Sequence, residues 1–276
     1  MEFFKSIEEI LEAGSVAEKK EKFAKFYAKF CVNEVEFEQE FSPKPLTKPF
    51  YAKFLKIEQV KDIKIKNKNL KKQSVDKNAL FLHSVAHIEF SAIDLALDAC
   101  YRFVGLPREF YADWLEVASD EIRHFDMINA ELEKTGFKYG DFSVHDGLFE
   151  ALKKTQNSLL ERMAVVPRHL EAGGLDANFY LLSQIDKNPE KSHLKPLLEV
   201  ILNEEISHAA KGDKWFKFEC DRLGILPDCF FEIVQKHYPK AFKTTRTINE
   251  AARLKAGYSQ SEIEKIKELQ RQFSRD

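Results

Sequence analysis

The chain has 276 residues, of which 44% are hydrophobic, and its 43 basic and 45 acidic residues leave a formal net charge of −2. This length is enough for one large or two small domains with a substantial apolar core. The balanced charge gives no overall attraction to nucleic acid or to an anionic membrane, so we expect neither as a partner.

Two further features predict a soluble cytoplasmic protein. The N-terminal segment contains acidic side chains where a signal peptide needs an apolar core. The sequence also has no uninterrupted apolar run long enough to predict a transmembrane helix. The cysteines form no CxxC pair, and a chain of this size does not need disulfides to fold, so we expect reduced thiols at Cys31, Cys100, Cys220 and Cys229.

Residues 1–72 are predicted to hold two short helices and an extended arm. The helices fall near 3–13 and 16–31, and Ser15 is placed to cap the second. Three prolines in FSPKPLTKPF oppose helix formation, so we expect the rest of this region to be an arm packed by its aromatic side chains. Its lysine-rich end, 61–72, is expected to be a solvated linker, with an electrostatic docking patch as the alternative.

Long helical segments follow. The first runs from about Asp76 to Val104 and the second over about 108–135, each followed by a glycine that is typical of a helix end. The third runs from about 148 into the 160s. Pro167 and the Gly173–Gly174 pair are expected to loosen or end it, with a shorter helix near 177–186 after them.

The fourth long helix is predicted to begin near Asn188 and Pro189, or only at Pro196, and to end at Gly224. Short helices are expected near 228–237, 247–256 and 260–273. Since no strand alternation occurs, the pattern predicts an all-α protein built on a four-helix bundle. We place the bundle at 73–226, an N-terminal region at 1–72 and a C-terminal helical extension at 227–276, all in one structural unit.

A motif pair occurs twice in the chain. HIEFSAID (87–94) in the first long helix matches HLEAGGLD (169–176) in the third, and DEIRH (120–124) in the second matches EEISH (204–208) in the fourth. Each half therefore reads HxE and then [DE]ExxH at nearly the same spacing. A single ExxH is weak evidence for a metal site, because short motifs specify function loosely. The duplicated order predicts two similar helical hairpins that together supply one site.

The spacing suits metal binding. Glu and His three positions apart lie on one face of a helix and can reach the same point, while the HxE glutamate comes from the partner helix. Four carboxylates and two imidazoles are the ligand set of dimetal helix bundles and suit iron or manganese. The predicted ligands of two such ions are Glu89, Glu121, His124, Glu171, Glu205 and His208.

Four other residues are predicted to support these ligands without touching metal. Asp120 and Glu204 precede the ExxH glutamates and are candidates to hold the ring N–H of a histidine ligand, with exposed surface acids as the alternative. His87 and Asp94 share another face of their helix and are interpreted as a structural or ligand-supporting polar pair, with counterparts at His169 and Asp176.

These motifs resemble the ferritin-like superfamily of dimetal carboxylate proteins. The chain is more closely similar to a bacterial ferritin-like family whose role is unassigned, through stretches such as HSVAHIEFSAIDLALDACYRF, DEIRHF, RMAVVPRHLEAGGLD and EEISHAAKGDKWF. Gly173 stands where that family usually has arginine. The resemblance covers most of the chain and implies the fold and the metal site, and in the superfamily the acid before the ExxH glutamate often hydrogen-bonds a histidine ligand. It implies no particular reaction.

The leading functional hypothesis is an oxygen- or peroxide-dependent oxidoreductase that acts on an unknown small-molecule substrate. An iron oxidation and handling protein, and a metal-binding module without turnover, are the alternatives. A homodimer is one candidate assembly.

Overall fold

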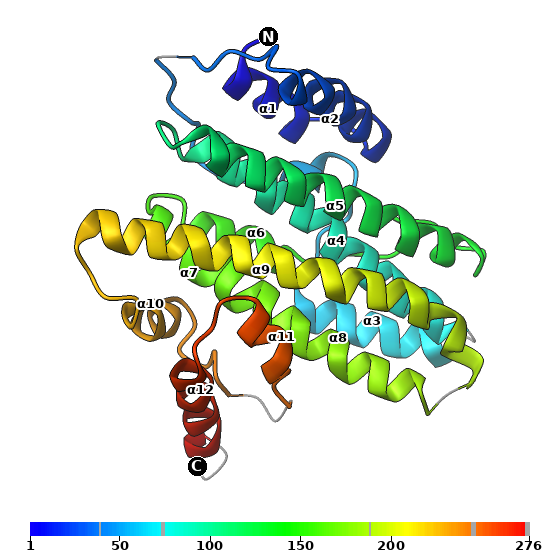
Figure 1. The fold of residues 1–276 in the computed structure, drawn as a ribbon. Coiled ribbons are helices and arrows are strands. Elements are labelled where there is room, and N and C mark those ends of the chain that lie inside the picture. Colours follow the sequence, from blue (N-terminus) through cyan, green and yellow to red (C-terminus); the bar gives the residue numbers. More distant parts are fainter. Residues whose placement is uncertain (39, 73–74, 188, 244–246, 274–276) are drawn as a thin grey trace. The chain divides into compact units, whose positions relative to one another are not determined.

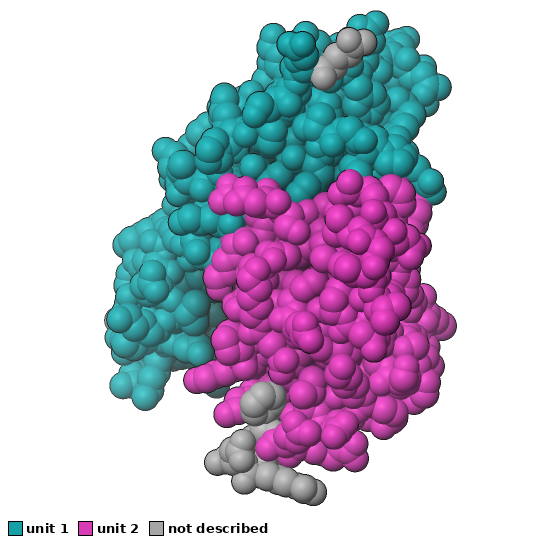
Figure 2. Space-filling model, turned by 90° about the vertical axis from the view of Figure 1, so that its left-hand side faces the viewer, with its two compact units in different colours: residues 1–153 teal, residues 154–276 magenta. Residues whose placement is uncertain are grey.

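The computed structural model describes residues 1–38, 40–72, 75–187, 189–243 and 247–273, and the chain divides into two compact units, 1–153 and 154–276 (Figures 1 and 2). Throughout these described residues the regular elements are helices, and the extended backbone makes two isolated bridges, Glu2–Glu36 and Ile57–Val144. The predicted all-α class is confirmed. The predicted three-part division stays a prediction, and its first boundary, at Gln73, lies outside the described residues.

The first unit is centred on a hairpin of two long helices, α4 and α5, which pack along their lengths. Ser15 caps α2 as predicted, by accepting a hydrogen bond from the Glu18 N–H. The helices of this unit are α1 (Phe3–Leu11), α2 (Val16–Cys31), the 3-10 helix η1 (Phe50–Lys53), α3 (Val60–Lys72), α4 (Lys77–Arg102), α5 (Arg108–Glu133) and α6 (Gly147–Lys154).

Aromatic rings join the N-terminal segment to this hairpin. Phe3 at the start of α1 stacks on Phe37 of the arm, with ring centroids 4.4 Å apart, and its ring lies 4.9 Å from that of Tyr111 on α5. Farther along the arm, Phe41 packs edge-on against Tyr101 of α4. These contacts agree with the expected role of the arm's aromatic side chains, since buried aromatic pairs stabilise beyond the area that they cover.

The lysine-rich segment differs from the expected linker. Residues 60–72 form α3, none of whose side chains is buried. Lysine is a good helix former, and this stretch contains no proline or glycine. Lys66 also pairs with Glu58, just before the helix. Local helix propensity and this ion pair therefore both favour a helix here.

The second unit packs a segmented helix against one long helix. The segmented helix consists of α7 (Leu159–Val165), the π-helix η2 (Val166–Glu171) and α8 (Ala172–Ile185), all of which contact α9 (Lys195–Leu223). Gly224 ends α9 in the left-handed conformation, as the sequence predicted. The 3-10 helix η3 (Pro189–Leu194) precedes α9, and α10 (Cys229–His237), α11 (Glu250–Lys255) and α12 (Gln260–Phe273) follow it. The predicted cap at Asn188 lies outside the described residues.

The π-helix explains how the chain passes Pro167. Proline lacks an N–H and crowds the preceding turn of an α-helix, and the wider π turn accommodates it. The glycine pair does not end the helix as expected, because Gly173 and Gly174 lie inside α8. Gly212 of α9 makes room for the proline ring, since a Cβ atom at this position would lie 2.3 Å from the Cβ of Pro167.

Helix α4 is long and apolar enough to cross a membrane by length and composition alone, but 78% of its apolar window is buried inside the structure. The core helix of a soluble protein passes the same test, so this feature is weak evidence for a membrane span.

Candidate metal centre

The α4–α5 hairpin brings three predicted ligands together. Nδ1 of His124 lies 3.4 Å from a carboxylate oxygen of Glu89 and 3.5 Å from one of Glu121. One ligand atom from each residue falls in a group whose members are all within 4.8 Å of one another. The side chains are buried, with relative exposures of 6% for Glu89, 1% for Glu121 and 0% for His124. This group can bind a metal ion.

Helix geometry accounts for the arrangement. Glu121 and His124 are three residues apart on α5, so they project from the same face. Glu89 projects from α4 on a turn whose neighbours Ala86, Phe90 and Ile93 are fully buried. An apolar face that carries two carboxylates and an imidazole is unusual, because buried charges normally require pairing or a bound cation.

The electrostatics of the group favour positive charge between the carboxylates. Burial lowers the pKa of His124, but the hydrogen bonds and charges of Glu121 and Glu89 outweigh burial and raise it to about 11. The imidazolium proton therefore supplies the positive charge when no cation is bound. A metal ion that binds this nitrogen must displace the proton, so binding releases protons to solvent.

The second unit carries the matching motif on α9. Nδ1 of His208 lies 3.7 Å from a carboxylate oxygen of Glu205; His208 is fully buried and Glu205 is half-buried. Glu171 is the last residue of the π-helix, which packs against α9, and its side chain is half-buried. The structure thus places three predicted ligands in each unit.

The four predicted supporting residues differ in their surroundings. Asp120 accepts a hydrogen bond from Nη2 of Arg123 at 2.6 Å on the same helix, and Glu204 is half-buried on α9. Their contact with a histidine ligand stays a prediction. His87 and Asp94 have separate partners and are both buried.

The His87 ring is held at both nitrogens. Nε2 lies 2.8 Å from the carbonyl oxygen of His145, which only accepts, so Nε2 carries the proton and donates it. Nδ1, 2.9 Å from the hydroxyl of Tyr139, then accepts. Burial lowers the pKa of His87 to about 4, which keeps the ring neutral. His87 therefore fixes the segment between α5 and α6 against the helix that carries Glu89.

Buried ion pairs involve the aspartates of both motif copies. Asp94 accepts from Nζ of Lys19 on α2 at 2.6 Å, and Asp176 accepts from Nη2 of Arg253 on α11 at 2.7 Å. Sequence reasoning missed both cations. Lys19 lies among several other lysines, and nothing in the local pattern separates it from its exposed neighbours.

The residues fit a divalent cation by the chemistry of their donor atoms. Carboxylate oxygens and imidazole nitrogens are both common ligands of divalent metal ions. The structure thus describes an all-α protein in which a buried Glu–His group can bind a metal ion, with a related motif in the second unit.

The chain belongs to the family DUF455, described as proteins of unknown function, which matches residues 12–264. A relative from Haemophilus influenzae, called only an uncharacterized protein, is 40% identical over 200 residues, which are 70% of this chain and 68% of the relative. No solved structure shows a significant match.

Proposed function

We propose that the two motif copies contribute to one dimetal centre in a ferritin-like four-helix bundle. The observation that supports this proposal most directly is the buried group of Glu89, Glu121 and His124, whose donor atoms suit a cation. The repeat in the sequence supports a second, matching contribution from Glu171, Glu205 and His208. Two divalent cations would balance the charge of four carboxylates, which would otherwise repel each other in a buried site.

A pair of iron or manganese ions would supply one-electron redox chemistry with dioxygen or peroxide. The protein's part is to fix the ligands on helices, to hold each histidine ring in one tautomer through Asp120 and Glu204, and to exclude bulk water. We therefore propose an oxidoreductase that acts on a small molecule in the reducing cytoplasm. The burial of Glu121 and His124 supports a dry site.

The alternative within the same site is iron oxidation and handling. That function requires a large cage of subunits, so particle size separates it from a substrate-oxidising enzyme. A redox-silent zinc module is the remaining alternative; its absorption spectrum would not change with oxygen or peroxide.

Elemental analysis of protein expressed with added iron tests the proposal. We expect two metal ions per chain, and a loss of at least half of the bound metal in Glu121→Ala and in His208→Ala, because each removes a ligand from one motif copy. Glu116→Ala on α5 and Glu199→Ala on α9 change exposed acids on the same helices and should keep the full metal content.

Circular dichroism of each variant separates loss of a ligand from loss of the fold. Two metal ions per chain in folded Glu121→Ala and in folded His208→Ala would refute the assignment. Loss in Glu121→Ala alone would restrict the centre to the first motif copy.

A further inference from the structure

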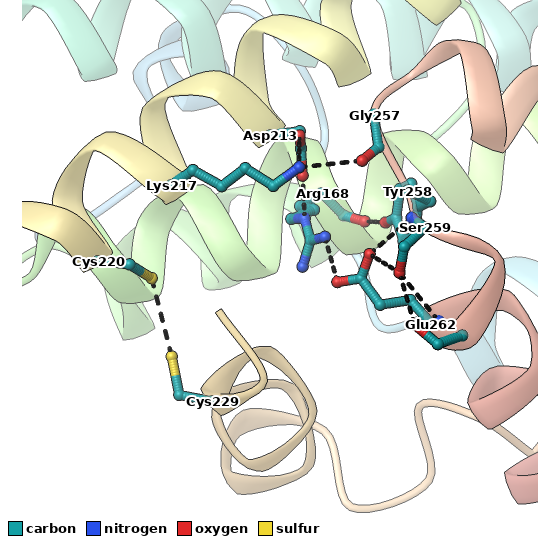
Figure 3. Close-up of polar contacts among 10 residues, drawn as sticks. Arg168, Asp213, Lys217, Cys220, Cys229, Gly257, Tyr258, Ser259 and Glu262 are labelled. Carbon is teal, nitrogen blue, oxygen red and sulfur yellow. Dashed lines mark hydrogen bonds and ion pairs between the residues drawn. The ribbon is translucent and has the colours of Figure 1, made fainter. Parts of the chain in front are cut away.

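Two cysteines meet at the turn between α9 and α10, away from the candidate ligands in sequence. Cys220 lies in the last turn of α9 and Cys229 is the first residue of α10, and their sulfur atoms are 4.0 Å apart (Figure 3). Gly224, with φ of 66°, and the hydrogen bond from the Ile225 N–H to the Cys220 carbonyl fix the turn that brings them together.

The two thiols differ in access. Cys220 is fully buried, whereas Cys229 is partly exposed to solvent. An incoming reagent therefore reaches Cys229 first, and Cys220 is placed behind it as the second thiol. The other cysteines lie in the first unit, where Cys31 is exposed on α2 and Cys100 is buried in α4.

A buried cation influences the charge state of this pair. The Arg168 guanidinium is fully buried, 4.4 Å from the ring of Phe230 and 4.9 Å from the ring of Phe216, and the two phenylalanines flank the cysteine pair along the chain. Its Nε and Nη2 groups donate to Asp213 and Glu262, but its Nη1 group has no hydrogen-bond partner among the residues that the structure describes (Figure 3). The positive charge favours the thiolate form of both cysteines.

We propose that Cys220 and Cys229 form a reversible thiol–disulfide pair, oxidised by a low-molecular-weight disulfide such as glutathione disulfide. The contact distance, the fixed turn and the difference in access carry this inference. It does not depend on the proposed metal centre.

The exchange balances in two steps. The Cys229 thiolate attacks one sulfur of the small disulfide, forms a mixed disulfide and releases one thiolate. Cys220 then loses its proton to solvent, attacks the Cys229 sulfur and displaces the second small thiolate. The two protein thiols have lost two electrons, and the reagent has become two thiols.

The reaction should be slow at neutral pH and faster in base. Burial raises the pKa of Cys220 to about 12, and burial also raises that of Cys229, in both cases against the opposing effect of Arg168. Because the thiolate is the nucleophile, the rate should rise with pH as its population grows. The pair thus suits a sustained change of redox conditions rather than rapid turnover.

The experiment uses the full chain, incubated with glutathione disulfide at mildly alkaline pH. We expect the internal disulfide to lower the number of free thiols from four to two. If Cys31 is first replaced by serine, the number should fall from three to one. Peptide mapping should link Cys220 to Cys229. The melting temperature should rise on oxidation and return when dithiothreitol is added, since the bond ties α10 to α9.

Single variants identify the order of attack. Cys220→Ser should accumulate a glutathione adduct on Cys229, and Cys229→Ser should leave Cys220 unmodified. Adducts confined to Cys31, or a stable adduct on Cys229 without the internal link in the unsubstituted chain, would overturn the proposal.

Discussion

The two hairpins share a motif but differ in how their first helix is built. In the first unit α4 is an uninterrupted helix of 26 residues, and Glu89 projects from its middle. In the second unit the corresponding stretch is divided at Pro167 into α7, a π-helix and α8, and Glu171 ends the π-helix. The same candidate ligand types can therefore be carried by quite different local backbones, and the repeat in sequence does not imply a repeat in helix geometry.

The two hairpins are more alike in how chain segments outside the hairpin helices pack against them. Each has an aspartate seven residues after the motif histidine, and this aspartate pairs with a buried cation from outside the hairpin: Lys19 for Asp94 and Arg253 for Asp176. The motif histidines in both units also contact segments outside the hairpin helices. His87 bonds to Tyr139, and the ring of His169 lies 5.6 Å from that of Phe242. The repeat thus includes attachment points as well as candidate ligands.

The largest effects should come from removing these cations. Lys19→Met leaves a buried carboxylate at Asp94 without its partner, and we expect a loss of about 3–5 kcal/mol in the free energy of unfolding. Arg253→Met should cost less, because the Asn249 N–H still donates to Asp176. Urea unfolding of both variants measures the difference.

The double variant Lys19→Met/Asp94→Leu provides the control for this prediction. Replacing both charges with apolar side chains removes the unpaired carboxylate, so most of the lost stability should return. Equal losses in the single and double variants would indicate that packing around Lys19, rather than its charge, holds α2 in place.

A pH effect should arise in the first unit from His83. Its Nε2 atom accepts hydrogen bonds from the backbone N–H groups of Gly140 and Phe142, and burial lowers its pKa from 6.5 to about 4. The unfolded chain therefore takes up this proton first on acidification. Stability should be unaffected above about pH 6.5 and should fall by up to about 3 kcal/mol as the pH decreases to about 4.

The variant His83→Gln separates this effect from other titrations. Its side-chain oxygen can accept hydrogen bonds but does not titrate, so unfolding curves measured across this pH range should show a smaller dependence than those of the unsubstituted chain. An unchanged slope would place the acid sensitivity elsewhere, for example at His87, whose pKa is also lowered.

Two glycines of the second unit give a smaller, opposed pair of effects. Gly212→Ala would place a Cβ atom 2.3 Å from the Cβ of Pro167 and should cost about 1–3 kcal/mol through overpacking. Gly173→Ala, inside α8 and with open space around it, should stabilise by up to about 1 kcal/mol. Thermal unfolding distinguishes the expected loss of stability from the expected gain. If Gly212→Ala left the stability unchanged, the π-helix around Pro167 would have to shift easily to make room for the added Cβ atom.

Local signals in the sequence were sufficient to predict the all-α class and the positions of most helix ends. Gly105 and Gly136 follow the ends of α4 and α5, and Gly224 caps α9, because glycine adopts the left-handed backbone that ends a helix. The i,i+3 spacing likewise predicted that Glu121 and His124 share a face. These features depend on a few neighbouring residues, which is why they can be read from the chain alone.

Features that depend on distant residues could not be predicted in this way. The helix passes Pro167 and the glycine pair because Gly212, more than 40 residues later, leaves room for the proline ring. Lys19 is buried because of Asp94, and no local pattern marks it. The lysine-rich α3 was misjudged for the opposite reason: composition favoured a linker, although propensity alone permits a helix.

The ion pair between Asp176 and Arg253 bears on how this chain tolerates shortening. A protease cut or an engineered stop before Asn249 would remove the Arg253 guanidinium and the Asn249 amide together, leaving Asp176 in α8 with neither donor. The C-terminal segment therefore stabilises the second unit, and truncated chains that lack it should be less soluble than the full chain.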